Sequence, residues 1–464
     1  MRKINRNLTE GHTGRHLVGL TWPMLMGLMG MVVFHLADTY FIGRLGVQQL
    51  AAIGFSFPVI MLVNSLAHGV GIGTSSLVSR NIVGVDRRFV RMMSSRAILL
   101  GLIIVLVFVA VGLLTIRPLF TVLGAEEELL GYIYDYMSIW YFGVVFVVVP
   151  MIGNNIIRAT GDTFTPGMIM MLAALINFIL DPLFIFGIGP FPAMGIKGAA
   201  LATVISRSTN LVLVLIILIR RERLLTIYIG RFRDVLKTWV DVLHIAGPAS
   251  LALLITPLSI GLITRIISGF GKEAVAAFGV ASRIETFALM VISALGSVLI
   301  IFMGQNISQL KFSRIRQAVR YSGIFSLGWG AVISIVFFFF AEPVSALFSE
   351  NELVKDTTSL YLKIVGMSYG FQGLVMISIS SFNGLNKPLP AAFFSVVRMM
   401  GLYVPFAWIG SSIWGLQGVF WACFSANVIS GIITYLFLIR TVRRLKSFHS
   451  HLPENTYPDG MYTA

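Results

Sequence analysis

Apolar stretches of about 20 residues recur along the whole 464-residue chain, separated by short polar segments. Each stretch is long enough to cross the hydrocarbon core of a bilayer, about 30 Å, as an α-helix. The mean hydropathy is +0.87 and only 12% of the residues are charged, against about 25% in soluble domains. The short alternating segments of a transmembrane barrel do not occur in the sequence. The chain is therefore predicted to be an all-α polytopic membrane protein.

The apolar pattern predicts twelve transmembrane helices. Their ranges are 16–43, 48–79, 95–116, 129–153, 164–186, 198–219, 242–268, 274–305, 321–341, 359–382, 389–411 and 416–439. The first span is too long for the apolar core of a secretory signal, so we expect it to remain as the first helix. An even number of spans places both termini on one side of the membrane.

Lysine and arginine are distributed unevenly over the predicted loops. Of the 35 basic residues, 25 lie on the side of the termini, 5 on the opposite side and 5 within spans. Because positive charge marks cytoplasmic loops, both termini are expected in the cytoplasm. The formal net charge of +15 then reflects membrane topology, and no nucleic-acid partner is predicted.

The two halves of the chain resemble each other at a nearly constant shift. A shift of 225 residues aligns Pro23 with Pro248, Gly46 with Gly271, Gly54 with Gly279 and Asn81-Ile82 with Asn306-Ile307. Later, "GIKGAA" at 195 aligns with "GLQGVF" at 415, a shift of 220. Six helices thus occur twice in the same orientation, which predicts two pseudo-symmetric six-helix bundles around a substrate path. The predicted parts are an N-terminal lobe (1–220), a basic cytoplasmic linker (221–241), a C-terminal lobe (242–440) and a cytoplasmic tail (441–464).

Four predicted spans of the N-terminal lobe carry polar side chains in their outer halves. Asp38 lies near the outer end of the first span, and Asn177 and Asp181 share one face of the fifth because they are four residues apart. Tyr136 and Thr203 lie in the outer halves of the fourth and sixth spans. A carboxylate at membrane depth costs about 2.5 to 3.5 kcal/mol, so such residues usually have a function. We predict that these side chains bind a coupling cation.

Two carboxylates in a dry lobe cannot both ionise cheaply. Either one of them holds a proton, or both ionise around Na⁺, held by Asp38, Asn177, Asp181 and Thr203. Pro182 is expected to kink or end the fifth span and to free the Phe178 carbonyl. Pro23 allows the first span to bend, so loading the site is expected to move that helix. The alternative is a buried polar knot that only ties helices together.

Glu285 lies near the middle of the eighth span, with Arg283 two positions before it. Together they are a possible secondary charge site that faces substrate or a gate. The alternative is an internal ion pair of Glu285 with Arg283, Arg265 or Arg398. Arg207 follows Thr203 by one turn and could tune the cation site or serve helix packing.

Several stretches resemble the multidrug and toxic compound extrusion (MATE) transporters, most closely their DinF-like branch. They are "WPMLMGLMGMVVFHLADTYFIGRLG", "LAAIGFSFP", "GVGIGTSSLVSRNIVG", "GNNIIRATGDTFTP" and "NFILDPLFIFGIG". The resemblance implies a two-bundle exporter driven by Na⁺ or H⁺ antiport across a bacterial-type cytoplasmic (inner) membrane. It also implies a cation site in the N-terminal lobe formed by Asp38, Tyr136, Asn154, Asn177, Asp181 and Thr203. Asn154 enters only through this resemblance.

The NorM-type branch of the family carries acids in the seventh and tenth helices, and this chain has none there. In the repeat, Asp38 aligns with Ile263. A cation site of the NorM type is therefore not expected in the C-terminal lobe.

The sequence thus predicts a secondary active multidrug exporter rather than an enzyme. It would exchange organic, often cationic, drugs for H⁺ or Na⁺, without another cofactor or a nucleotide motif, as a monomer in the lipid bilayer. The 21 methionines and 35 phenylalanines suit a plastic cavity for bulky compounds. The alternative is a lipid-linked precursor flippase of the same superfamily, which would need a cationic cleft. An alternative of another class is an intramembrane enzyme or receptor. Aspartate-rich metal motifs such as DDxxD would support an enzyme, and the sequence has none.

Overall fold

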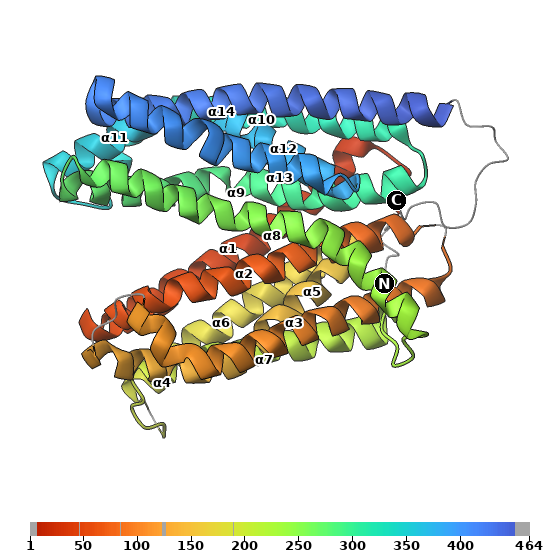
Figure 1. Ribbon diagram of the computed structural model, residues 1–464, viewed down its shortest axis with the longest axis horizontal. Coiled ribbons are helices and arrows are strands. Elements are labelled where there is room, and N and C mark those ends of the chain that lie inside the picture. The colour runs from red at the N-terminus through yellow and green to blue at the C-terminus, as the bar shows by residue number, and fades with distance from the viewer. Residues whose placement is uncertain (1–6, 46, 84, 123–126, 189, 451–464) are drawn as a thin grey trace. The chain divides into compact units, whose positions relative to one another are not determined.

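The structure is a computed structural model that describes residues 7–45, 47–83, 85–122, 127–188 and 190–450. Over these residues the regular structure is helical throughout (Figure 1). The first helices are α1 (Thr13–Gly43), α2 (Val47–Asn81), α3 (Arg87–Val122), α4 (Glu127–Gly143), α5 (Val145–Ala159), α6 (Phe164–Phe186), α7 (Ile196–Ile216) and the π-helix η1 (Ile217–Arg221). The others are α8 (Phe232–Ser268), α9 (Lys272–Ser308), α10 (Phe312–Ala346), α11 (Glu352–Gly366), α12 (Tyr369–Gly384), α13 (Pro388–Val396), the π-helix η2 (Val397–Tyr403) and α14 (Val404–Ser450).

Each of the twelve predicted spans has a helical counterpart in the described residues, so the all-α, multi-span prediction is confirmed. Two predicted spans each consist of two helices, α4 with α5 and α11 with α12. The axes of α11 and α12 are bent by 59° relative to each other. The last two spans are separated by a kink at Trp414 and Gly415, where Gly415 has a φ of +59°. Glycine adopts this left-handed conformation without a steric penalty.

Several helices extend beyond the apolar runs that predicted them. α8 begins at Phe232 inside the predicted linker, and α14 continues to Ser450 inside the predicted tail. Backbone hydrogen bonding continues past the hydrocarbon boundary, whereas an apolar run ends there, so hydropathy underestimates helix length.

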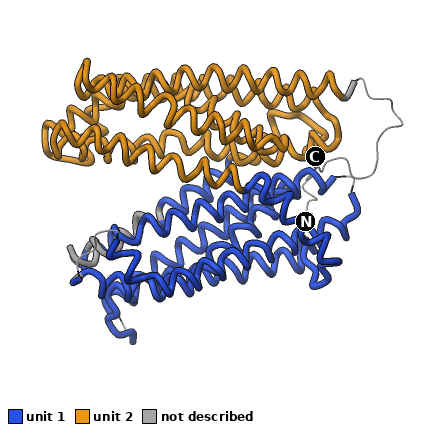
Figure 2. Tube along the Cα trace, viewed as in Figure 1, with its two compact units in different colours: residues 1–7, 22–246 blue, residues 8–21, 247–464 orange. Residues whose placement is uncertain are grey.

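The described chain divides into two compact units, which Figure 2 shows in different colours. The first unit contains Trp22–Ala246, and the second contains Leu8–Thr21 together with the described residues from Gly247 onward. The divisions fall inside α1 and α8, just before Pro23 and Pro248, and they are 225 residues apart. That distance equals the shift of the sequence repeat. The predicted lobes, 1–220 and 242–440, place the boundary in the linker instead.

Within the first unit, α1 packs against α6 through backbone contact. A Cβ atom at Gly27 would lie 2.9 Å from the Gly167 Cα, and one at Gly167 would lie 2.6 Å from the Pro23 carbonyl oxygen. Further along the same helices, the Phe41 and Phe178 rings are in contact, with centroids 5.7 Å apart. Only glycine permits helices to approach this closely. The packing sets α1 directly beside α6, the helix that carries Asp181.

Candidate functional site: an acid cluster in the first unit

Four helices of the first unit bring charged and polar side chains together. Asp38 on α1 interacts electrostatically with Asp181 on α6 and with Arg207 on α7. Tyr136 on α4 interacts electrostatically with all three of these side chains. These residues, with Asn177 and Thr203, are called the acid cluster below. The structure therefore brings Asp38, Asp181 and Tyr136 together, three of the residues that the sequence predicts to form a cation site.

Asn177 and Asp181 are both fully buried, at 0% exposure. The Asn177 Nδ2 donates a hydrogen bond of 3.1 Å to the Asp181 Oδ1, which fits their shared helix face. Pro182 does not end α6, contrary to one of the expected outcomes, because the helix continues to Phe186 and is capped by Gly187 in the left-handed region. Proline can still not donate to the Phe178 carbonyl.

Four buried oxygens of the acid cluster have no hydrogen-bond partner among the described residues. They are Asp38 Oδ1, Asn177 Oδ1, Asp181 Oδ2 and Thr203 Oγ1. Buried polar atoms are normally paired, so such orphans call for an explanation. Carboxylate, amide and hydroxyl oxygens are the ligands that hard cations bind, and a carboxylate can also take a proton. The residues present therefore fit H⁺ or Na⁺.

Arg207 is a member of the acid cluster for which the sequence left two roles open. Its guanidinium carbon lies 4.4 Å from the centroid of the Phe34 ring on α1, in cation–π contact. The positive charge of the Arg207 guanidinium also interacts with the Asp38 carboxyl group. The sequence signal was its position four residues after Thr203, on the same helix face. Phe34 itself was not predicted as a site residue.

Asn154 lies elsewhere on the same unit's helices. Its Nδ2 donates to the Asn210 Oδ1 on α7 at 3.5 Å. No hydrogen bond between Asn154 and the two acids is found in the described residues. The structure thus brings Asn154 to α7, but not into direct contact with Asp38 or Asp181.

The structure places the Glu285 carboxylate away from Arg283, with which an ion pair was one of the alternatives. The Glu285 carboxylate accepts hydrogen bonds from the Tyr361 hydroxyl at 2.7 Å and from the Gln372 Nε2 at 2.9 Å. The Arg283 side chain is exposed. Residues two apart on a helix do not face each other, which explains the separation. Among the ion pairs of the described residues, none contains Glu285.

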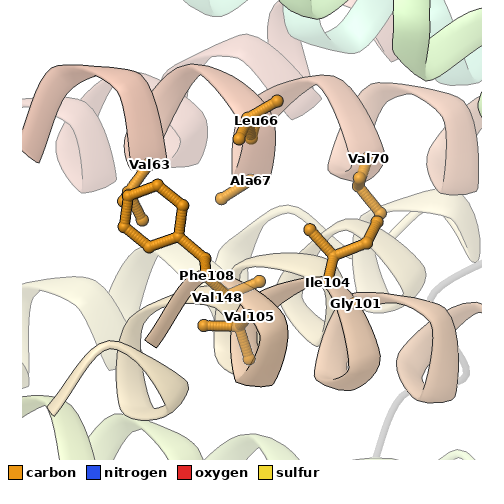
Figure 3. A pocket seen from close by; sticks show the side chains of 9 residues that line it. All are labelled: Val63, Leu66, Ala67, Val70, Gly101, Ile104, Val105, Phe108 and Val148. Atoms are coloured by element: carbon orange, nitrogen blue, oxygen red, sulfur yellow. The ribbon is translucent and has the colours of Figure 1, made fainter. Parts of the chain in front are cut away.

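A pocket in the first unit lies between α2, α3 and α5, and Figure 3 shows its lining. Eight of the nine lining residues have apolar side chains and the ninth is a glycine: Val63, Leu66, Ala67, Val70, Gly101, Ile104, Val105, Phe108 and Val148. Such a lining offers no ligand to a cation, so this pocket is separate in chemistry from the acid cluster.

A sequence model of the MatE family matches residues 23–183 and 248–409. The chain belongs to the MatE family. The two matched segments begin at Pro23 and Pro248, the residues that the 225-residue shift aligns and that follow the divisions in α1 and α8. The resemblance to MATE transporters is therefore confirmed, and the chain is a membrane transporter rather than an enzyme.

Two proteins and one solved structure are similar to this MatE transporter over most of its length. The FAD transporter of Shewanella oneidensis is 39% identical over 96% of this chain and 98% of its own length. The probable multidrug resistance protein YoeA of Bacillus subtilis is 25% identical over 89% of this chain and 90% of its own. The crystal structure of the Vibrio cholerae MATE transporter VcmN in the bent form has a TM-score of 0.89 and 32% identity, covering 94% of this chain and 98% of that one. The twelve-helix fold of two six-helix bundles is thereby confirmed.

Proposed function

We propose that this protein is a secondary exporter in which the acid cluster binds the coupling ion, H⁺ or Na⁺. The observation that carries the proposal is the group of four buried oxygens without partners, two of which belong to carboxylates on different helices. A cation supplies what these oxygens lack. The protein would work in a cytoplasmic membrane with both termini inside.

The charges of the acid cluster support one monovalent ion per cycle. Two ionised carboxylates and one guanidinium leave a net charge of −1. One H⁺ or one Na⁺ neutralises that charge, and a second would reverse it. An uncompensated buried charge is strongly unfavourable, so the neutral, loaded cluster is favoured over the empty one.

Coupling to motion follows from the placement of the acids on α1 and α6. When the ion leaves, repulsion between Asp38 and Asp181 favours separation of the two helices. The backbone contact at Gly27 and Gly167 resists that separation, and Pro23 gives α1 a point at which to bend. We propose that ion loading and release move α1 in this way.

For the exported compound, FAD is the first candidate. The relative named as an FAD transporter is 39% identical over nearly the whole chain, against 25% for YoeA. FAD is an anion at neutral pH, unlike the often cationic drugs that the sequence predicts as the exported compounds.

Structurally varied drugs are the second candidate, because YoeA is named a multidrug resistance protein. The two candidates differ in charge, so they are separable by the same assay.

The test uses purified full-length protein in proteoliposomes with Na⁺ and H⁺ gradients imposed separately. FAD and the cationic dye ethidium are the transported probes. FAD transport driven by one of the gradients is the expected result. Gradient-independent transport would contradict the coupling, and transport of ethidium alone would select the second candidate.

A further inference from the structure

A second polar cluster lies inside the second unit, on different helices. It contains Glu285 on α9, Tyr361 on α11, Tyr369 and Gln372 on α12, Arg398 and Tyr403 on η2, and Cys423 and Asn427 on α14. These residues are called the arginine cluster below.

A continuous set of hydrogen bonds connects the charged ends of the arginine cluster. Gln372 donates to Glu285 and accepts a 3.2 Å hydrogen bond from the Asn427 Nδ2. The Asn427 Oδ1 in turn accepts a 3.1 Å hydrogen bond from the Arg398 Nη1. Asn427 also donates to the Ser368 hydroxyl at 3.0 Å. Glu285 and Arg398 are thus joined through two amides, and no direct ion pair links them in the described residues.

The unpaired atoms of the arginine cluster are hydrogen-bond donors. The Arg398 Nε and the Tyr369 hydroxyl have no hydrogen-bond partner among the described residues, and the Tyr403 hydroxyl has only the Cys423 thiol. Tyr369 is 0% exposed and Tyr403 is 6% exposed. The Tyr403 hydroxyl lies beside the Cys423 thiol, which is only a weak acceptor. In the acid cluster the orphans are the Arg207 Nε, the Thr203 hydroxyl and three carboxylate or amide oxygens, so acceptors predominate there and the two clusters favour ligands of opposite polarity.

The backbone is irregular at the arginine cluster. Arg398 and Tyr403 lie on a π-helix, η2, and Tyr369 is the first residue of α12 after the 59° bend. π-Helical segments are frequent at functional sites. Irregular backbone at membrane depth is found where it is buried in protein or lines a cavity, and broken helices form many transporter sites.

The sequence repeat relates the two clusters to each other. Tyr361 is the counterpart of Tyr136 at the shift of 225 residues. At the shift of 220, Cys423 and Asn427 are the counterparts of Thr203 and Arg207. The two clusters thus share the counterparts of α4, α6 and α7, whereas Glu285 lies on α9, the counterpart of α2, and not on α8, the counterpart of α1.

We propose that the arginine cluster binds an anionic oxygen group, such as a phosphate or a carboxylate, of the exported compound. The Arg398 Nε and the Tyr369 and Tyr403 hydroxyls are the donors to that group. The inference rests on the proposed export function and names its substrate class. It gives the molecule a cation site in the first unit and an anion site in the second.

Glu285 opposes the anion because it carries the same charge. Tyr361 and Gln372 hold its carboxylate, and the charge of Arg398 offsets it. The titratable groups around it are Tyr361, Tyr369, Tyr403 and Cys423, together with the charged Arg398. Neutralising Glu285 would therefore strengthen anion binding.

The test measures binding of FAD, ADP and neutral riboflavin to the full-length protein in nanodiscs by equilibrium dialysis. Arg398→Gln is expected to weaken binding of FAD and ADP about tenfold or more, since a hydrogen bond to a charged group is involved. Tyr369→Phe is expected to weaken it a few-fold and Glu285→Gln to strengthen it. Riboflavin binding should stay unchanged in all three variants.

Arg265→Gln is the matched control, because Arg265 is an exposed arginine of α8 in the same unit. Tyr369→Phe removes a single hydroxyl and keeps the ring, so it tests the site even if Arg398→Gln does not fold. Wild-type affinity for FAD and ADP in Tyr369→Phe and in folded Arg398→Gln would overturn the proposal. Failure of the wild type to bind either anion would overturn it as well.

Transport measurements separate this inference from the proposed function. If the wild type exports FAD and folded Arg398→Gln and Tyr369→Phe export it equally well, the export function stands and the anion site is wrong. If ADP binding depends on Arg398 but no FAD is exported, the anion site stands and the flavin substrate is wrong.

Discussion

The Asp38 side chain on α1 and the Asp181 side chain on α6 repel each other in the interior of the first unit, although they are far apart in the sequence. Asp181 also accepts a hydrogen bond from Asn177, whereas the buried Oδ1 of Asp38 has no partner among the described residues. The two carboxylates are thus held near each other by the packing of α1 and α6 and not by a hydrogen bond between them in the described residues. Two like charges held in this way need a counter-ion, which makes them the first target for mutation.

Asp38→Asn is expected to abolish gradient-driven export, because one carboxylate with Arg207 no longer leaves a net charge for the ion to neutralise. Export of FAD into proteoliposomes under H⁺ and Na⁺ gradients measures this, with membrane abundance determined by immunoblot. Glu342→Gln is the control, since Glu342 is an exposed acid paired with Lys363. Retained gradient-driven export in Asp38→Asn would refute the assignment of the coupling site.

Glu285→Gln is expected to keep the dependence of export on the ion gradient. Glu285 belongs to the second unit and contacts Tyr361 and Gln372 rather than the acid cluster. The quantity to measure is the ratio of export rates with and without the gradient. A fall of this ratio to the value of Asp38→Asn would move the coupling site, or part of it, into the second unit.

Gly167→Ala is expected to destabilise the protein, because the new Cβ would lie 2.6 Å from the Pro23 carbonyl oxygen. Overpacking of this kind typically costs about 1–3 kcal/mol. Thermal unfolding in detergent measures the effect as a lower midpoint. Gly131→Ala serves as the control, since a Cβ there has no atom within 4 Å. Equal midpoints for the two variants would show that α1 and α6 do not pack as described.

Arg314→Ala is expected to release the segment before α1 from α10 and the rest of the second unit. Two hydrogen bonds join the Arg314 Nη2 to the carbonyls of Leu8 and Glu10, at 2.9 and 3.0 Å. Hydrogen exchange of the Leu8 amide, which donates to the Gln305 Oε1 at 3.1 Å, should become faster. Arg316→Ala provides the comparison, because Arg316 is exposed on the same helix. Unchanged exchange in Arg314→Ala would mean that the other contacts of the segment, including the hydrogen bonds of Leu8 with Gln305 and Asn306, hold it without Arg314.

The sequence alone determined the helical class, the twelve spans, the repeat and the pairing of Asn177 with Asp181. These are local properties: a run of apolar residues is long enough to cross a bilayer or it is not, and a spacing of four shares a helix face. The repeat also aligns Tyr361 with Tyr136, but only the structure shows that Tyr361 belongs to a polar cluster.

Only the tertiary structure decided which side chains from different helices meet. It joined Glu285 to Tyr361 and Gln372 instead of Arg283, brought Arg207 to Asp38, and assigned Leu8–Thr21 to the second unit. Hydropathy records how deep a residue lies in the membrane but not the rotation of its helix or the identity of its neighbours. Those are set by packing, through close contacts such as that of Gly27 with Gly167, and packing depends on residues distant in sequence.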